Sequence, residues 1–262
     1  MKQRNNMERG ISTEQRAHEQ LQSFLSDCNI ENPQGKKTLE IGFKNGLFLD
    51  ECRKAGLIAT GLEINKEYLE KVKKEFPHLD LRWYDGGKFP IPDNYFDFVV
   101  SFQVLEHVNS TEHIIKECLR VLKDGGIMYH ICPNYHSFYE GHYQVFWLPF
   151  LNKKTARIYL KLLGHYTSYF EGLNIIKPKH IIKVFKKYQN ELEMISLGKK
   201  EFIRKFNPEQ IEKVNQRFLK KCLKVLNAIP AIKKCFLWTA CATGFYYPIT
   251  VISRKKTSFQ EK

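Results

Sequence analysis

Short apolar runs alternate with amphipathic segments along residues 36–133, after a polar helix expected at residues 13–28. The runs have the length and the β-branched content of buried strands, and the segments between them carry apolar residues at helical spacing. The pattern predicts five strands (36–42, 57–64, 79–85, 96–103 and 126–133) and three intervening helices (48–56, 65–76 and 110–126). Strands that alternate with helices of this length form βαβ units, so we expect an α/β fold with a parallel sheet between two helical layers.

After Pro133 the alternation changes. Residues 134–176 are rich in Tyr, Phe and His and contain no clear strand pattern. The chain then resumes with an expected helix (177–189), a strand (191–198), one or two basic helices (200–234) and a last strand (245–255). We therefore expect one sheet domain with two insertions, one after the fifth strand and one before the final strand.

Residues 236–253 carry no formal charge and are flanked by lysines and an arginine. Eighteen residues are at the lower length limit for a membrane-spanning helix. Gly244 and Pro248 interrupt the run, and its end matches the expected final strand. We interpret the segment as buried sheet in preference to a membrane span.

The cysteines narrow the class of protein further. Seven are scattered over the 262 residues without a CxxC pair, which favours reduced thiols and excludes a disulfide framework or a cysteine zinc site. The N-terminal residues show no apolar run typical of a signal peptide, which indicates a cytoplasmic protein. An aromatic content of 13% excludes general disorder.

The net charge of +14 is unevenly distributed. Residues 1–149 carry 18 basic and 21 acidic side chains, and residues 150–262 carry 24 basic and 7 acidic ones. The second part of the chain, at +17, is therefore expected to face an anionic partner. Either nucleic acid or the inner face of an anionic membrane fits that description, the latter through amphipathic helices such as residues 218–229.

Candidate ligand-binding residues follow the first three strands. Glu40, Gly42 and Gly46 lie where the first strand turns into a helix, and such glycines let the backbone approach a ligand. Glu63 ends the second strand about 20 residues later, where an acidic side chain is suited to accept both hydroxyls of a ribose. Asp85 follows the third strand and could accept an amino group of a purine.

In four ordered motifs the chain resembles the class I S-adenosylmethionine-dependent methyltransferases, in particular the type 11 and type 12 subgroup with an LEHV segment. The motifs occupy residues 38–49, 59–65, 84–108 and 117–134. The resemblance implies a Rossmann-like, doubly wound seven-stranded sheet and S-adenosylmethionine as cofactor. The cofactor contacts that it implies are Glu40, Gly42, Gly46, Glu63, Ile64, Asp85, Gly86 and Gln103.

The pattern along the chain, together with the resemblance, predicts a domain organisation. Residues 1–35 are expected to form a helical extension, and residues 36–262 the methyltransferase domain. Within that domain we expect core motifs at 36–134, an aromatic insertion at 134–176, a basic helical insertion at 199–240 and the final strand at 245–255.

One position departs from the family pattern. Lys44 stands where relatives usually have a second glycine. If the backbone needs a positive φ there, lysine costs on the order of 1 kcal/mol in strain.

Histidines mark the expected acceptor side. A hydroxyl acceptor benefits from a general base, and histidine is suited to that role near pH 7. His142 is the preferred candidate, followed by His136 in the same aromatic loop (133–150) and His107 in the LEHV segment. Too few further ligands stand at metal spacing, so no metal site is predicted.

These observations favour a methyltransferase acting on a hydroxyl of a small molecule, a sugar or a lipid-linked glycan precursor. The overall pattern also resembles bacterial enzymes that modify surface glycans. Two alternatives stay open: an RNA methyltransferase that uses the basic half, and a non-catalytic cofactor-binding scaffold.

Overall fold

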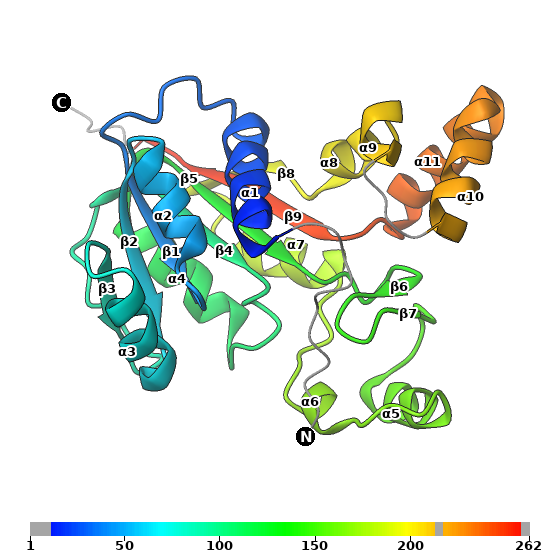
Figure 1. The fold of residues 1–262 in the computed structure, drawn as a ribbon, viewed down its shortest axis with the longest axis horizontal. Helices are drawn as coiled ribbons and strands as arrows, with labels where there is room; N and C mark the ends of the chain where they lie inside the picture. The colour runs from blue at the N-terminus through cyan, green and yellow to red at the C-terminus, as the bar shows by residue number, and fades with distance from the viewer. Residues whose placement is uncertain (1–11, 213–216, 258–262) are drawn as a thin grey trace.

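The computed structural model describes residues 12–212 and 217–257, with the side chains of residues 217–219 left aside. The protein contains a seven-stranded sheet of order β3-β2-β1-β4-β5-β9-β8, drawn in Figure 1. β9 runs antiparallel to both of its neighbours, and the other strand pairs are parallel. The strands of this sheet are β1 (Lys37–Ile41), β2 (Ile58–Glu63), β3 (Asp80–Trp83), β4 (Phe96–Phe102), β5 (Leu122–Cys132), β8 (Leu192–Ser196) and β9 (Ile249–Lys255). The predicted α/β fold with a doubly wound seven-stranded sheet is confirmed.

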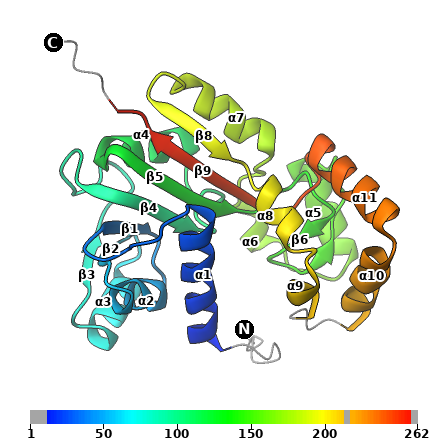
Figure 2. The ribbon, with the colours of Figure 1, turned by 90° about the horizontal axis from the view of Figure 1, so that it is seen from above.

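Helices cover both faces of the sheet, as Figure 2 shows. One layer holds α1 (Thr13–Asp27), α2 (Leu47–Lys54) and α3 (Lys66–Glu75), and the other holds α4 (Thr111–Val121) and α7 (Pro178–Lys187). The two layers bury separate apolar clusters against the sheet. The domain therefore has the three-layer arrangement that the alternating pattern predicts.

The expected N-terminal extension packs on the sheet as part of the helical layer. Phe24 of α1 is fully buried and lies edge-on to Phe48, Phe98 and Tyr129. Ser12 caps the helix by accepting a hydrogen bond from the backbone N–H of Gln15. The first eleven residues of the predicted extension lie outside the described residues.

The aromatic insertion after β5 forms a small unit with its own core. It comprises a two-strand hairpin, β6 (Tyr139–Glu140) with β7 (Val145–Phe146), followed by α5 (Lys153–Leu162) and α6 (Ser168–Glu171). Trp147, Tyr135 and Phe170 are buried together in it. Part of the aromatic content thus stabilises the insertion, whereas other rings stay exposed.

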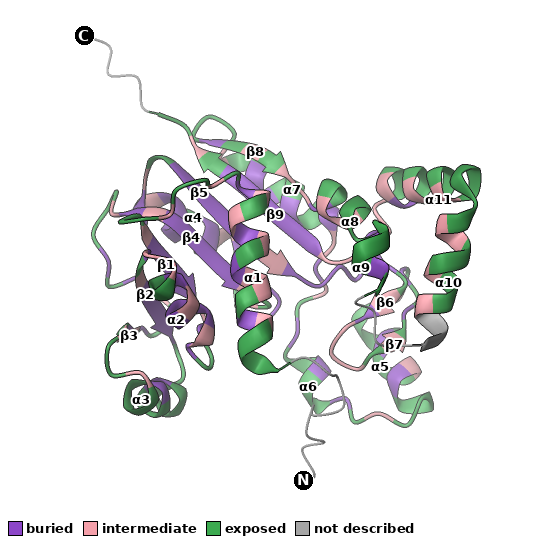
Figure 3. Ribbon diagram, turned by 45° about the horizontal axis from the view of Figure 1, so that its top comes forward, coloured by how far each residue is buried: buried purple, intermediate pink, exposed green. Residues whose placement is uncertain are grey.

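The basic insertion between β8 and β9 projects from one end of the sheet as a helical arm, defined here as residues 199–243 (Figure 1). It contains α8 (Lys199–Arg204), α9 (Pro208–Glu212), α10 (Arg217–Ala228) and α11 (Pro230–Thr243), and residues 213–216 of the predicted helices lie outside the described residues. Figure 3 shows α10 and α11 mostly exposed.

The expectation of buried sheet over residues 236–253 is wrong for residues 236–243, which belong to α11. Pro230 stands in the first turn of this helix and Gly244 ends it with a φ of 81°. Proline in the first turn and glycine after the last turn are common at the ends of helices. These two residues therefore mark the segment between them as a helix, although its apolar composition also suits a buried strand. Among the residues that the structure describes, no helix is long and apolar enough to span a bilayer.

Candidate functional site

The turn after β1 lies where the sheet order reverses between β1 and β4. In such sheets ligands bind at the carboxyl ends of the strands. Gly42, Lys44 and Gly46 have φ values of 72°, 49° and 73°. A Cβ at Gly42 would lie 2.7 Å from Cγ2 of Val104, so this position has no room for a side chain. The turn is therefore held close to the segment that follows β4.

Lys44 adopts the left-handed backbone conformation that the family pattern fills with glycine. We expect Lys44→Gly to raise the free energy of unfolding by about 0.5 kcal/mol, because relief of strain exceeds the entropy gained by the unfolded chain. Urea unfolding followed by circular dichroism measures the change. The matched control Lys71→Gly, inside α3, is expected to lower the same quantity by about 0.5–1 kcal/mol. A destabilised Lys44→Gly variant would contradict strain at this position.

Two carboxyl groups lie near this turn. Glu40 is buried, and its Oε2 has no hydrogen-bond partner. Burial, together with the negative charge of Glu63, raises the pKa of Glu40 to about 8. Glu63, at the end of β2, accepts hydrogen bonds on Oε1 from the backbone N–H groups of Ile64 and Asn65, each at 2.9 Å. These bonds fix one oxygen of Glu63 and direct the carboxylate toward the strand end.

The other predicted cofactor contacts lie at the ends of β2, β3 and β4. Ile64 is 59% exposed, and Trp83 on the paired strand donates its indole N–H to the Ile64 carbonyl at 2.9 Å. Asp85 accepts the backbone N–H of Gly87 at 2.9 Å, and Gly86 between them has a φ of 90°. Together they make a partly apolar, partly acidic surface beside Glu63.

Gln103 has a φ of 57° directly after β4, and its backbone N–H donates to the Ile131 carbonyl.

Trp83 was not predicted from the sequence as a site residue. Its position near the end of the third expected strand could have marked Trp83 as a ligand-binding candidate. Its placement beside Ile64, however, depends on the register between β2 and β3.

A second cluster joins the loop after β4 to the hairpin. Nε2 of His142 lies 3.7 Å from Oε1 of Glu106, and Nε2 of His107 lies 4.0 Å from the same oxygen. Nδ1 of His142 lies 2.8 Å from Oε1 of Glu140. Glu106 is fully buried and neither of its oxygens has a hydrogen-bond partner. A buried carboxylate is thus directed at two imidazole rings without a direct bond.

The protonation of the cluster follows from these contacts. Burial alone would lower the pKa of His142, but Glu106 and Glu140 outweigh it and raise that pKa to about 9. Burial lowers the pKa of His107. Near pH 7 the proton of the cluster therefore lies on His142.

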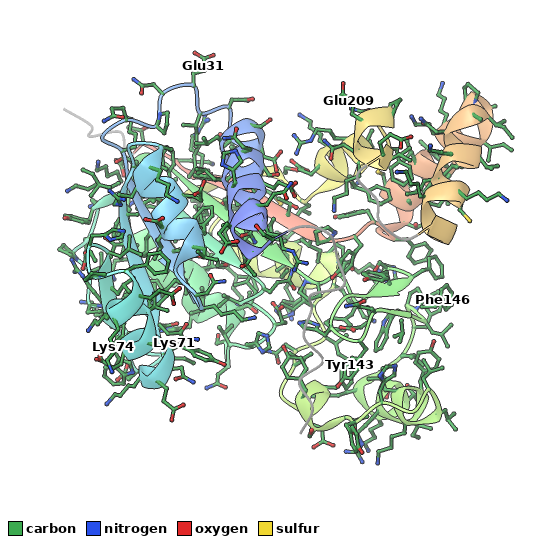
Figure 4. The ribbon with its side chains drawn as sticks, in the orientation of Figure 1. Glu31, Lys71, Lys74, Tyr143, Phe146 and Glu209 are labelled. Carbon is green, nitrogen blue, oxygen red and sulfur yellow. The ribbon has the colours of Figure 1, made fainter. Side chains whose placement is uncertain are left out.

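Aromatic rings close the cluster on one side. The ring of Tyr169 in α6 lies 5.4 Å from that of His142 and 5.7 Å from that of His107, and its hydroxyl lies 3.3 Å from Nε2 of His107. Tyr143, labelled in Figure 4, donates its backbone N–H to Glu140. The insertion thus supplies one wall of the cluster and the loop after β4 supplies the other.

The third histidine candidate, His136, has different neighbours. Its ring lies 4.8 Å from that of Phe245 and 6.2 Å from that of Phe150. The structure therefore groups His142 with His107 and sets His136 among apolar rings.

Glu106, His107 and His142 offer one carboxylate oxygen and two imidazole nitrogens within 4.8 Å of one another, a set that could hold a divalent cation. No metal site was predicted from the sequence, because too few further ligands stand at metal spacing, whereas the fold brings His142 to Glu106 and His107. The position of Glu106 next to the candidate His107 in the sequence could have marked it as a further site residue.

Part of the chain is similar in sequence to known methyltransferases. Residues 39–130 match the model of the family described as "Methyltransferase domain". A probable S-adenosylmethionine-dependent methyltransferase of Mycolicibacterium smegmatis is 32% identical over 107 residues, 41% of this chain and 42% of that protein. A ubiquinone biosynthesis O-methyltransferase of Coxiella burnetii is 27% identical over 99 residues, 36% of this chain and 42% of that protein. The match thus spans less than half the length of these curated relatives.

Among solved structures, a putative sarcosine dimethylglycine methyltransferase from Galdieria sulphuraria has a TM-score of 0.55 at 17% identity. The superposition covers 92% of this chain and 86% of that one. At this identity the likeness concerns the fold. It extends through the insertions, beyond the segment that the family model matches.

Proposed function

We propose that this chain is a class I S-adenosylmethionine-dependent methyltransferase, since residues 39–130 match the methyltransferase-domain family, and that it methylates a hydroxyl group held between Glu106, His107 and His142. The observation that carries the proposal is the buried Glu106 carboxylate, whose two oxygens lack partners beside two histidines. An acceptor hydroxyl would supply the missing donor.

The chemistry of the residues at the ends of β1, β2 and β3 fits S-adenosylmethionine. The partnerless oxygen of Glu40 suits the ammonium of the methionine part, and Glu63 retains a second oxygen for ribose hydroxyls. Ile64 and Trp83 offer an apolar surface to a flat base. When bound, the cofactor supplies a methyl group on a sulfonium, which is open to in-line attack.

Proton movement on the acceptor side follows from the pKa pattern. Since His142 keeps its proton near pH 7, Glu106 is better suited than His142 to take the proton of the hydroxyl. Glu140 holds Nδ1 of His142, so that Nε2 stays directed at Glu106. We therefore propose Glu106 as the proton acceptor in place of His142, the base preferred from the sequence. His142 has a positioning role in this proposal.

The proposed acceptor classes are a small molecule, a sugar or a lipid-linked glycan precursor. Tyr169 supplies an aromatic face and a hydroxyl group beside His142 and His107, a combination suited to a ring that carries hydroxyls. The O-methyltransferase named for ubiquinone biosynthesis supports transfer to oxygen.

The pH dependence of cofactor affinity tests the cofactor side. Glu40 carries a proton below about pH 8, and only its carboxylate form attracts an ammonium, so binding must release that proton. We expect the affinity for S-adenosylhomocysteine to rise between pH 6.0 and 7.5, by up to about tenfold per pH unit. Calorimetric titration in two buffers of different ionisation enthalpy measures both the affinity and the released proton.

The variant Glu40→Gln has no carboxyl to titrate, so it should bind more weakly and with a flat pH profile. An equal slope in both proteins would remove Glu40 from the ammonium site. Absence of binding to folded wild-type protein at every pH would contradict the methyltransferase proposal and favour the scaffold.

A further inference from the structure

Helix α11 of the arm is mainly apolar yet mostly exposed. Of its 14 residues only Ala240 is buried, whereas Ile232, Phe236 and Trp238 are 53%, 43% and 71% exposed. Val225 of α10 is 56% exposed as well. A helix of this composition is normally covered by protein or lipid. The described part of the chain leaves it open to the outside, as Figure 3 shows.

The same arm is strongly basic. Residues 199–243 contain 11 Lys and Arg and 3 Asp and Glu, a net charge of +8. Glu212 is paired with Lys220 and Lys224, which leaves Lys221 and Lys234 exposed among the apolar side chains. The surface that covers α10 and α11 therefore has to be apolar and negatively charged together.

The hairpin next to the acceptor site carries a second group of exposed apolar side chains. Phe245, two residues after the end of α11, has ring contacts with Phe138 at 4.9 Å and with Phe150 at 6.4 Å. Phe138 stacks on Phe146 at 5.8 Å, and Phe138, Phe146 and Phe150 are 44%, 60% and 78% exposed. We refer to Phe138, Phe146 and Phe150 as the aromatic rim. Figure 4 places Phe146 on the far side of the molecule from Lys71 and Lys74.

The rim and the acceptor cluster share one hairpin. Glu140 on β6 is buried against His142, and Phe146 on β7 is exposed. Residues next to each other in a strand point to opposite faces, so the hairpin presents Glu140 to the cluster and Phe146 outward. The rim and the proposed acceptor site therefore lie on opposite faces of the same hairpin.

We propose that α10, α11 and the aromatic rim dock on an anionic lipid bilayer, and that the acceptor is drawn from that surface. The surface of such a bilayer has negatively charged headgroups above apolar acyl chains. Exposed Trp and Phe side chains insert among the acyl chains, and Lys side chains bind the headgroups. A second copy of the chain would oppose two arms of the same positive charge, which disfavours self-association. The acceptor side of this inference deepens the proposed function and rests on it.

Vesicle co-sedimentation tests the docking. The wild-type chain is expected to bind vesicles of 70% phosphatidylcholine and 30% phosphatidylglycerol at least tenfold more tightly than vesicles of phosphatidylcholine alone. Lys221→Glu with Lys234→Glu should lower binding to the anionic vesicles at least tenfold. The matched control, Lys71→Glu with Lys74→Glu on α3, carries the same charge change away from the arm and should bind like the wild type.

A second pair of variants tests apolar insertion. Trp238→Ser should weaken binding severalfold, whereas Ile58→Ser, an exposed apolar residue at the start of β2, should not. In the wild type a blue shift of tryptophan fluorescence with anionic vesicles is expected, and Trp238→Phe should lose that shift while still sedimenting. These variants alter exposed side chains, so loss of the fold is not the expected cause of weaker binding.

Several results would overturn the docking. One is absence of vesicle binding by protein that still binds S-adenosylhomocysteine, an outcome that leaves the cofactor side of the proposed function intact. A second is a loss of vesicle binding in the α3 control as large as in the arm variant. A third is a stable dimer that Trp238→Ser dissociates, and a fourth is salt-sensitive RNA binding without vesicle binding. Loss of cofactor binding with retained vesicle binding would instead contradict the proposed function alone.

Discussion

Glu106→Gln is expected to lower the rate of methyl transfer by about 10²–10⁴-fold while leaving affinity for S-adenosylhomocysteine within about twofold of the wild type. Glutamine keeps the shape of the side chain but cannot accept the hydroxyl proton. The carboxylate is buried beside two histidines and neither of its oxygens has a hydrogen-bond partner, so an acceptor hydroxyl can donate to it. Single-turnover methyl transfer with a panel of hydroxyl acceptors, including lipid-linked sugars, measures the rate.

The controls for this variant separate chemistry from structure. Glu112→Gln changes an exposed carboxylate at the start of α4, whose partner is Lys187, and should leave turnover unchanged. His142→Ala should lower turnover as well and should also alter its pH profile, because the group with the pKa of about 9 is lost.

The outcomes for Glu106 are distinct. Unchanged turnover in Glu106→Gln would remove this residue from the reaction. A wild-type rate abolished by EDTA and restored by Mn²⁺ or Zn²⁺ would assign Glu106, His107 and His142 to a divalent cation, contrary to the proton transfer proposed here.

Glu63→Ala is expected to weaken binding of S-adenosylhomocysteine by about 10–100-fold, or about 1.4–2.8 kcal/mol. The loss has two parts: charge-assisted hydrogen bonds to the ribose hydroxyls, and the bonds that hold Ile64 and Asn65 at the end of β2. Calorimetric titration at pH 7.5 measures the dissociation constant.

Glu67→Ala is the matched control for Glu63, since it removes a carboxylate four residues further along, in the first turn of α3. It should leave the dissociation constant unchanged. Glu63→Gln should fall between the wild type and Glu63→Ala, because the amide oxygen can still accept from the two backbone N–H groups. A Glu63→Ala constant within twofold of the wild type would refute the ribose assignment.

Much of the fold could be predicted because its signals are local. The strand at Phe96–Phe102 and the helix at Pro178–Lys187 carry their own periodicity, and each lies within two residues of its predicted bounds. The turn at Gly42 and Gly46 is marked by glycines that the backbone there requires. The boundary between α4 and β5 was less accurate, since the glycines expected to end the helix lie inside the long strand β5.

Other parts depend on contacts between distant residues. Residues 236–243 have an apolar composition that suits either a buried strand or a helix, and an exposed helix was not expected from it. His142 was singled out as a base, but its high pKa results from Glu106, 36 positions earlier in the chain, and from Glu140. Nothing in the spacing of His136 and His142 shows that only one of them faces His107.

The sequence alone determined the α/β order of the chain, the ligand-binding edge of the sheet, the charge asymmetry and the resemblance to methyltransferases. These properties are encoded in periodicity and turn residues that act over a few positions. Only the tertiary structure decided that Glu106, His107 and His142 converge, and that α11 and the aromatic rim both stay exposed. Both depend on where the two insertions fold against the sheet, which long-range packing sets and local propensity does not.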